Sequence, residues 1–271
     1  MKLIALMVVK NEDDIVGYAL EHALEWADAI IIMNNNSTDD TEEILKLKAK
    51  LSDKIIYWGR YDGVFRDGLR ALLYLDNQDI FVEGDWIVRL DADEFFIHNP
   101  KEFLAAAPEE VNFVKSASFQ YYYTEKDYDD EMSNPDYLTV PPHLRLKYYS
   151  CNWSEFRCVK FTKGFSWPLG EKMGTLESWP TFDQKVIYSK RIHLKHFKYR
   201  SLAQIRKRVE VRMNVFDKTK QFPHEGNNTN ERRIYESKTM NYDDGIKDLI
   251  FDYKKLPPLI SSRDEGRAIV V

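Results

Sequence analysis

The first hundred residues alternate between short apolar runs and segments with helical spacing. The apolar runs Leu3–Val9, Ala29–Met33, Lys54–Trp58 and Trp86–Leu90 have the composition of strands buried in a sheet. Between the first two, apolar residues from 15 to 24 recur every three or four positions, as on the buried side of a helix. This alternation predicts right-handed crossovers and a mostly parallel sheet.

The second half of the chain is richer in β-prone segments. Val111–Thr124, Phe156–Phe161 and Lys185–His196 predict further strands, and the acidic stretch Glu125–Pro142 predicts a loop. Ser201 has Gln204 three positions later, a capping-box pattern that predicts the start of a long helix.

No internal repeat or linker interrupts these patterns, so we expect one α/β domain over residues 1–271. A Rossmann-like central sheet, mostly parallel and flanked by helices, is expected to build a ligand-binding half at 1–100. A smaller β-rich region is expected at 101–221, ending in a helix. Residues 222–271 are expected to form a polar carboxy-terminal extension.

Three polar segments follow the ends of predicted strands, at Lys10–Asp14, Asn34–Asp40 and Asp91–Glu94. In parallel sheets, ligands bind beyond the carboxyl ends of the strands. The predicted topology therefore brings all three segments to one edge of the sheet.

Asp91 and Asp93 form the sharpest motif, D-A-D-E-F-F. Two residues apart on a strand, both side chains point to one face and can reach one ligand. Neighbouring carboxylates repel each other unless a cation lies between them, and hard oxygen ligands suit Mg²⁺ or Mn²⁺ completed by phosphate and water. The same spacing also arises by chance on solvated loops, and that alternative stays open.

The segment from Asn34 to Thr41 joins an apolar run to a helix start. Backbone amides at a helix N-terminus can hold a base or a phosphate. A helix cap with no ligand explains the same pattern, so both interpretations remain.

Composition narrows the class of protein. With 39 Lys and Arg against 44 Asp and Glu, the net charge is −5, which does not favour a nucleic-acid-coating protein. The chain has 2 Cys, too few for a disulfide framework. The first apolar run is short for a signal peptide and no segment is long enough for a membrane span. We expect a cytoplasmic protein, with a peripheral contact to a membrane left open.

The three strand-end motifs together resemble those of family 2-like glycosyltransferases with a GT-A fold. They are V-K-N-E after the first strand, N-N-N-S-T-D-D-T after the second, and D-A-D-E-F-F after the fourth. The resemblance covers roughly residues 2–100 and resumes at 192–201, which is similar to the H-Y/F-x-x-x-S stretch of such proteins.

This resemblance implies a nucleotide-sugar donor, with a UDP-sugar as first choice, and transfer with inversion to a saccharide, glycolipid or other hydroxyl acceptor, as in polysaccharide biosynthesis. It implies Mn²⁺ or Mg²⁺ at Asp91 and Asp93, and His196 is a candidate third ligand. Arg60, Arg66 and Arg70 are candidates for the donor phosphates or base. The remaining donor-site residues implied are Lys10, Asn11, Glu12, Asn34, Asn35, Asp39 and Ala92.

Inverting transfer needs a carboxylate to take the proton of the acceptor hydroxyl. We expect Glu171, in the turn-like sequence W-P-L-G-E, with Glu155 as second choice. The resemblance is weakest at Asn34 and Asn35, because relatives commonly carry an Asp in that pair. A non-catalytic carbohydrate- or nucleotide-binding protein is therefore the alternative. A sugar-phosphate nucleotidyltransferase is disfavoured because no Gly-rich loop follows the first strand.

Overall fold

The computed structural model describes residues 1–167, 179–219, 233–261 and 266–271. The chain divides into two compact units. The first contains 1–117, 153–194 and 256–271, and the second contains 118–152 and 195–255. Because both units are assembled from separate stretches, neither coincides with 1–100, 101–221 or 222–271. The division of function among those three segments stays a prediction.

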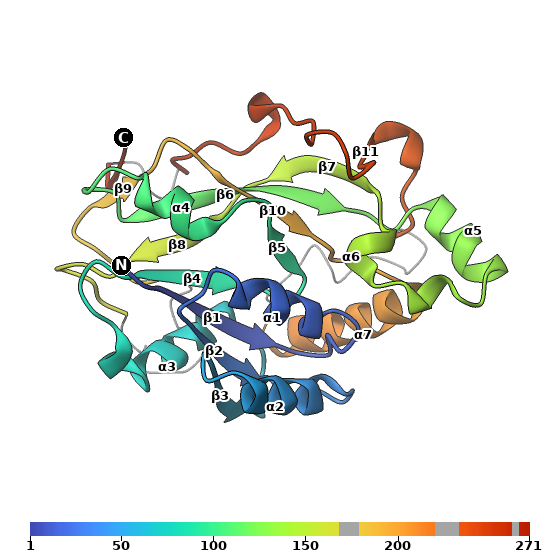
Figure 1. Ribbon diagram of the computed structural model, residues 1–271, viewed down its shortest axis with the longest axis horizontal. Coiled ribbons are helices and arrows are strands. Elements are labelled where there is room, and N and C mark those ends of the chain that lie inside the picture. Colours follow the sequence, from blue (N-terminus) through green and yellow to red (C-terminus); the bar gives the residue numbers. More distant parts are fainter. Residues whose placement is uncertain (168–178, 220–232, 262–265) are drawn as a thin grey trace. The chain divides into compact units, whose positions relative to one another are not determined.

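The sheet of the first unit is built on four parallel strands (Figure 1). Their order is β3 (Ile55–Arg60), β2 (Ala29–Asn34), β1 (Leu3–Val9) and β4 (Trp86–Leu90), and each neighbouring pair is parallel. β8 (Phe156–Lys160) then pairs antiparallel with β4. The predicted α/β class, with a mostly parallel central sheet, is confirmed.

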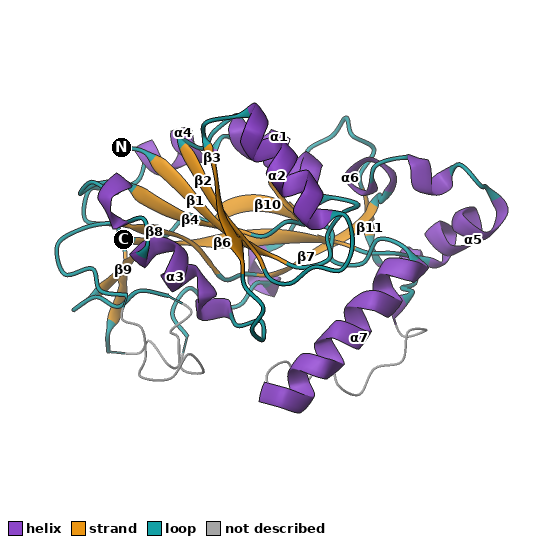
Figure 2. Cartoon of the chain, turned by 90° about the horizontal axis from the view of Figure 1, so that it is seen from below, coloured by secondary structure: helices purple, strands orange, loops and turns teal. Residues whose placement is uncertain are grey.

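Helices cover both faces of this sheet, and the alternation of side chains along β1 shows why. Leu3, Ala5, Met7 and Val9 belong to one buried cluster with α1 (Val16–Leu24) and α2 (Thr41–Leu51). Ile4, Leu6 and Val8 belong to another cluster with α3 (Arg70–Leu75). In Figure 2 the strands lie between α3 on one side and α1 and α2 on the other. A strand buried on both faces reads as a continuous apolar run, which is how β1 was predicted.

Shorter elements complete the first unit. β12 pairs with β9 in parallel, and Asn99 caps α4 by accepting a hydrogen bond from Lys101 N at 2.8 Å. These elements are η1 (Asp67–Leu69), η2 (Gln78–Ile80), β5 (Glu94–Phe96), α4 (Pro100–Ala105), β9 (Lys185–Ile187) and β12 (Ala268–Val270).

The second unit mixes helices with antiparallel strands. In its described part, β7 pairs antiparallel with β11. β6 (Phe113–Tyr121), β7 (Tyr148–Trp153) and β10 (Ile192–His196) have residues in both units. The other elements are α5 (Glu125–Ser133), η3 (Tyr137–Thr139), α6 (Pro142–Arg145), α7 (Leu202–Thr219), η6 (Ser237–Thr239), β11 (Asn241–Tyr242) and η7 (Tyr253–Lys255).

The predicted loop at Glu125–Pro142 is wrong, because α5 begins there. Thr124 and Asp127 form a capping box, in which Asp127 Oδ2 accepts from Thr124 N at 2.7 Å. The buried Asp127 also accepts from Tyr137 Oη at 2.6 Å. The T-x-x-D spacing of Thr124 and Asp127 is a capping-box pattern, which predicts the start of a helix. The acidic and proline-containing composition made the segment resemble a loop.

The predicted strand at Lys185–His196 is two strands, β9 and β10. The predicted long helix is confirmed as α7, and Ser201 Oγ accepts from Gln204 N at 3.2 Å. Among the helices described, none combines the length and the apolar character that crossing a membrane requires.

Candidate active site

The carboxyl ends of β1 and β2 meet, as the topology predicted. Asn35 N donates to Val9 O at 2.7 Å. Asn11 N donates to Ser37 Oγ at 3.0 Å, and Glu12 N donates to Thr41 Oγ1 at 2.8 Å. The first two predicted motifs therefore lie side by side.

Lys10 and Asn11 bind the loop that follows β2. Lys10 Nζ donates to the carbonyl oxygens of Asn35 and Asn36 at 2.9 and 3.0 Å. Asn11 Oδ1 accepts from Thr38 N at 2.8 Å. Asn11 and Asn36 have positive φ angles of 56° and 52°, a region that asparagine tolerates better than most side chains. These contacts give both Lys10 and Asn11 a role in shaping the loop.

Asn34 and Asn35 are completely buried and hold neighbouring loops. Asn34 Oδ1 accepts from Ser37 N at 3.1 Å, and its Nδ2 donates to Glu42 Oε2 at 2.8 Å. Asn35 Nδ2 donates to the carbonyl oxygens of Tyr61 and Gly63 at 3.0 and 2.8 Å. In this structure the amide nitrogens of both residues are therefore bonded within the protein.

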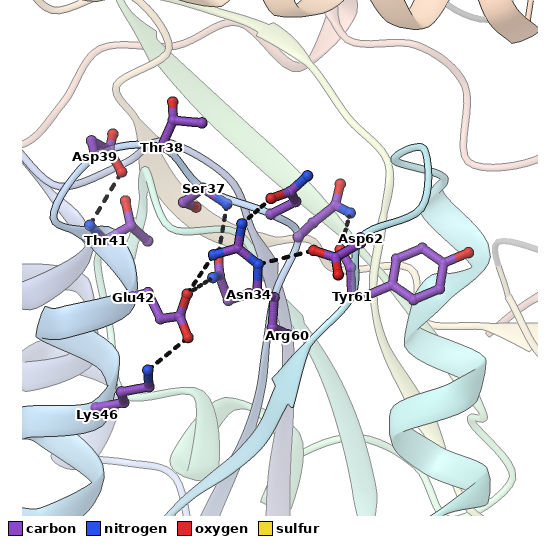
Figure 3. A network of polar contacts seen from close by, with 12 residues as sticks. Asn34, Ser37, Thr38, Asp39, Thr41, Glu42, Lys46, Arg60, Tyr61 and Asp62 are labelled. Carbon is purple, nitrogen blue, oxygen red and sulfur yellow. Dashed lines mark hydrogen bonds and ion pairs between the residues drawn. The ribbon is translucent and has the colours of Figure 1, made fainter.

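Glu42 is the centre of the polar network in Figure 3. It accepts from Lys46 at 2.8 Å, Arg60 at 2.7 Å and Tyr57 at 3.1 Å, in addition to Asn34. Hydrogen bonds from Lys46 and Arg60 lower the pKa of Glu42 to about 2. Burial and the Glu42 carboxylate raise the pKa of Tyr57 to about 12. Glu42 is therefore ionised at neutral pH, and its hydrogen bonds hold the carboxylate beside the end of β2.

Arg60 extends this network along the edge of the sheet. It donates to Asp62 Oδ1 at 2.9 Å and also to Asn36 Oδ1. Asp39 lies at the start of α2, where its carboxylate accepts from Thr41 N at 3.1 Å. Arg66 lies immediately before η1. Since Asp39, Glu42 and Glu43 already place negative charge at the start of α2, this helix end is unfavourable for a phosphate.

Asp91, Ala92 and Asp93 form the turn between β4, which ends at Leu90, and β5, which begins at Glu94. The two aspartates are not on a strand, so the strand-face argument does not apply to them. Asp93 is 5% exposed, and the Asp91 side chain is 24% exposed. The motif lies at the carboxyl end of β4, as expected.

The carboxylate of Asp91 contacts three guanidinium groups. Arg70 Nη2 donates to its Oδ1, Arg157 Nη1 lies 3.3 Å from its Oδ2, and Arg89 Nε lies 3.5 Å from its Oδ2. Burial alone would raise the pKa of Asp91, but Arg89, Arg70 and Arg157 hold it well below its ordinary value. Arg70 is 2% exposed and pairs with Asp91, and its predicted contact with the donor stays a prediction.

Glu155 contacts two of the same arginines. Its Oε1 accepts from Arg157 Nη2 at 2.6 Å, and its Oε2 lies 3.7 Å from Arg89 Nη1. The half-exposed Trp153 donates its indole N–H to Glu155 Oε1 at 3.3 Å. The second predicted catalytic carboxylate thus lies in the same cluster as Asp91.

The predicted roles of two other site residues are not tested. Glu171 lies outside the described residues. His196 ends β10 and belongs to the second unit, so its predicted part in a metal site stays a prediction. In the portion of the chain that the structure describes, no three His, Cys, Asp or Glu side chains are grouped to hold a metal ion.

The sequence reasoning missed Arg89 and Arg157. Arg157 interrupts the otherwise apolar start of β8, F-R-C-V, and a charged residue in a buried strand needs a charged partner. Arg89 stands two positions before Asp91. The pairing of Val88 with Cys158 sets the two arginines side by side, which only the antiparallel register reveals.

Comparison with known proteins gives one sequence match and several loose structural likenesses. Residues 4–60 match the family model for glycosyl transferase family 2. No curated protein matches the chain.

Two solved structures illustrate the likenesses. One is S. aureus TarS 1–349 in complex with UDP, at 14% identity and a TM-score of 0.33, covering 46% of this chain and 36% of that one. Another is the mannosyltransferase PcManGT from Pyrobaculum calidifontis in complex with GDP-Man and Mn²⁺, at 12% identity and a TM-score of 0.41. That match covers 81% of this chain and 64% of the mannosyltransferase.

This chain spans about a third of the TarS fragment and less than two thirds of the mannosyltransferase. The matched segment contains β1, β2 and β3 together with the first two strand-end motifs. Residues 4–60 therefore match glycosyl transferase family 2, in agreement with the predicted resemblance over that part of the chain.

Proposed function

We propose that the protein is a metal-dependent glycosyltransferase that moves a sugar from a nucleotide-diphosphate sugar to a hydroxyl acceptor, with inversion. One observation carries this proposal. The polar ends of β1, β2 and β4 meet at one edge of a parallel sheet, within the unit that contains the family 2 match. Such edges are where α/β proteins bind ligands.

The nucleoside of the donor is proposed to lie at the ends of β1 and β2. Lys10, Asn11 and Glu12 and the segment from Asn34 to Asp39 line this part of the edge. The acidic start of α2 favours an uncharged nucleoside over phosphate here. A UDP-sugar remains the first choice of donor.

The diphosphate is proposed to lie at the turn of Asp91, Ala92 and Asp93, with Mn²⁺ or Mg²⁺. The turn supplies hard carboxylate oxygens, which such an ion takes together with phosphate and water. Both oxygens of Asp91 already contact arginines. The ion would offset the negative charge that develops on the departing diphosphate. His196 remains a proposed further ligand.

Glu155 and Glu171 are proposed as candidates for the base that takes the proton of the acceptor hydroxyl. Glu155 is supported by its place beside Asp91, since both share Arg89 and Arg157. Trp153, next to Glu155, offers an exposed aromatic surface near that carboxylate. The acceptor class proposed is a saccharide or a glycolipid, used by a cytoplasmic enzyme of polysaccharide synthesis.

A panel of nucleoside diphosphates and nucleotide sugars tests this proposal through the thermal unfolding midpoint, with and without Mn²⁺. A ligand that binds only the folded state raises the midpoint. We expect one base to stabilise wild type in a Mn²⁺-dependent way, and Asp93→Asn to abolish that shift. Asp53→Asn is the matched control, because Asp53 is exposed and precedes β3 at its amino end.

No shift with any nucleotide contradicts the proposal. A nucleotide shift that is independent of Mn²⁺ and unchanged in Asp93→Asn favours the non-catalytic binding protein instead.

A further inference from the structure

Four tyrosines come together on neighbouring strands of the second unit. Tyr122 follows β6, Tyr148 begins β7, Tyr242 ends β11, and Tyr235 lies in the segment before β11. β6, β7 and β11 are successive neighbours in the sheet (Figure 1). We call these four residues the tyrosine row.

Ring contacts and main-chain pairing link the members of the tyrosine row. The ring centroids of Tyr235 and Tyr122 are 4.5 Å apart, and those of Tyr148 and Tyr242 are 5.2 Å apart. Tyr242 is directly opposite Tyr148 in the antiparallel pairing of β11 with β7. Tyr122 N donates to Tyr148 O at 2.9 Å, which makes the two ring pairs neighbours. The row therefore extends over more than one aromatic ring in the direction across the strands.

The alternation of burial along β7 shows which face carries the tyrosine row. Tyr149 is buried, whereas Tyr148 is half-buried and Asn152 is exposed. Asn152 Nδ2 donates to Tyr122 Oη at 3.1 Å, so Tyr122 lies on the same face as Asn152 and Tyr148. Tyr242 is 59% exposed. The row therefore reaches solvent, most fully at Tyr242.

The hydroxyl groups of the tyrosine row retain hydrogen-bonding capacity. Lys126 Nζ donates to Tyr148 Oη at 2.5 Å, and Asn152 donates to Tyr122 Oη, so both phenol oxygens act as acceptors. Within the described parts of the chain, none of the four phenol O–H groups donates to a protein acceptor. Because a phenol can donate as well as accept, the row offers unused donors beside its ring surface.

This combination of groups suits a saccharide. A sugar ring has an apolar C–H face and a rim of hydroxyls, and tyrosine offers an apolar ring with a polar tip. A single-stranded nucleic acid also stacks on aromatic rings, but it requires a positively charged groove along its backbone. Among the residues that the structure describes, Lys126 is the one cation in contact with the row, and its ammonium is bonded to Tyr148.

We propose that the tyrosine row binds a neutral oligosaccharide. The rings of Tyr148 and Tyr242 stack on sugar rings, and the phenol O–H groups and Asn152 bind sugar hydroxyls. Residues of the second unit alone supply these contacts. That the oligosaccharide is the acceptor of sugar transfer rests on the proposed function, whereas its binding does not.

Isothermal titration calorimetry of the full chain with neutral hexasaccharides of glucose, mannose and N-acetylglucosamine tests this proposal. We expect wild type to bind at least one of them. Tyr242→Ala is expected to weaken that binding about tenfold, because a stacking ring is lost. Tyr242→Phe keeps the ring and is expected to weaken it by no more than about threefold.

Tyr128→Ala is the matched control. Tyr128 lies on α5 of the same unit and is 36% exposed, and within the described residues its ring contacts none of the row. We expect its affinity to equal that of wild type. A loss in Tyr128→Ala as large as that in Tyr242→Ala overturns the proposal, because binding would then not depend on the row.

Asn152→Ala provides a second variant at an exposed side chain, should Tyr242→Ala fail to fold. It removes one hydrogen-bonding group of the site, and we expect binding about threefold weaker than in wild type. An unchanged affinity in Asn152→Ala and Tyr242→Ala overturns the proposal. So does the absence of binding to every hexasaccharide, or binding of an oligothymidylate alone that is lost in Tyr242→Ala.

Failure of this inference is distinguishable from failure of the proposed function. If wild type binds a nucleotide with Mn²⁺ but none of the hexasaccharides, the proposed function stands and the tyrosine row is not a saccharide site. If wild type binds a hexasaccharide through the row but no nucleotide, the site stands and the proposed function fails.

Discussion

Glu42 and Asp91 are both carboxylates held by arginine at the carboxyl edge of the same sheet, yet they differ in their exposure to water. The partners of Glu42 include Arg60 and Lys46, whose side chains are 42% and 50% exposed. The partners of Asp91 include Arg70 and Arg157, which are 2% and 1% exposed. These chemically similar ion pairs are therefore expected to differ in their contributions to the free energy of unfolding.

The exposure of each network to water determines how much it contributes to the free energy of unfolding. Exposed ion pairs contribute little, because solvent and salt screen them. A buried pair costs much more when one partner is removed, because the other charge is left without compensation. We infer that the Glu42 network shapes the loops around Asn34 and Asn36. The three arginines that contact Asp91 instead hold the sheet to the turn of the proposed diphosphate site.

The largest expected effect is that of Arg157→Gln. This change leaves Glu94, which is 3% exposed, without its arginine. A loss of about 3–5 kcal/mol in unfolding free energy is expected for breaking a buried pair. Urea denaturation at neutral pH measures it.

Arg60→Gln is the matched change in the exposed network. We expect its denaturation midpoint to stay close to that of wild type, because Arg60 is in contact with water. Equal losses of unfolding free energy in Arg157→Gln and Arg60→Gln contradict the inference that the exposed ion pair contributes less.

An intermediate effect is expected from Asn34→Asp. Asn34 is fully buried and donates to Glu42 at 2.8 Å, so an aspartate removes that donor and sets two carboxylates against each other. We expect a loss of about 1–3 kcal/mol, as for a buried hydrogen bond to a charged group. Chemical denaturation of Asn34→Asp, with and without Glu42→Gln, measures the coupling.

Asn36→Asp is the control for this change. Asn36 Oδ1 accepts from Arg60, so a carboxylate there meets a cation. A loss in Asn36→Asp as large as that in Asn34→Asp contradicts the role given to the Asn34–Glu42 hydrogen bond.

The smallest effect is a pH dependence from Glu42. Its folded pKa is lowered from 4.5 to about 2, so its contribution is present above the unfolded value and is lost as pH falls from about 4.5 towards 2. After allowance for solvent screening, we expect about 0.5 kcal/mol or less.

The difference in stability between wild type and Glu42→Gln, followed through this pH range, isolates the contribution of Glu42 from that of Asp91. A difference that grows as the pH falls contradicts the assigned sign.

The sequence predicted β1, β2 and β4 because each is largely buried and reads as an apolar run. It also predicted that the polar ends of β1, β2 and β4 share one edge, since parallel topology requires this. α5 was missed because its acidic composition resembled a loop, although Thr124 and Asp127 carried its capping signal.

The partners of Asp91 could not be predicted in the same way. Arg70, Arg89 and Arg157 lie on three elements, and only the register of β8 against β4 brings Arg157 beside Arg89. Likewise, the bond from Asn34 to Glu42 links two elements, and it accounts for an amide at position 34. Both features depend on tertiary pairing, which residue spacing does not encode.

Release of nucleoside diphosphate from a nucleotide sugar tests the central claim most directly. Wild type is incubated with each donor and Mn²⁺, with and without a saccharide acceptor, beside Asp93→Asn and Asp53→Asn. We predict release with one donor, accelerated by acceptor, retained in Asp53→Asn and lost in Asp93→Asn. Release that is equal in wild type and Asp93→Asn, or absent with every donor, contradicts the account of this edge as a glycosyltransferase site.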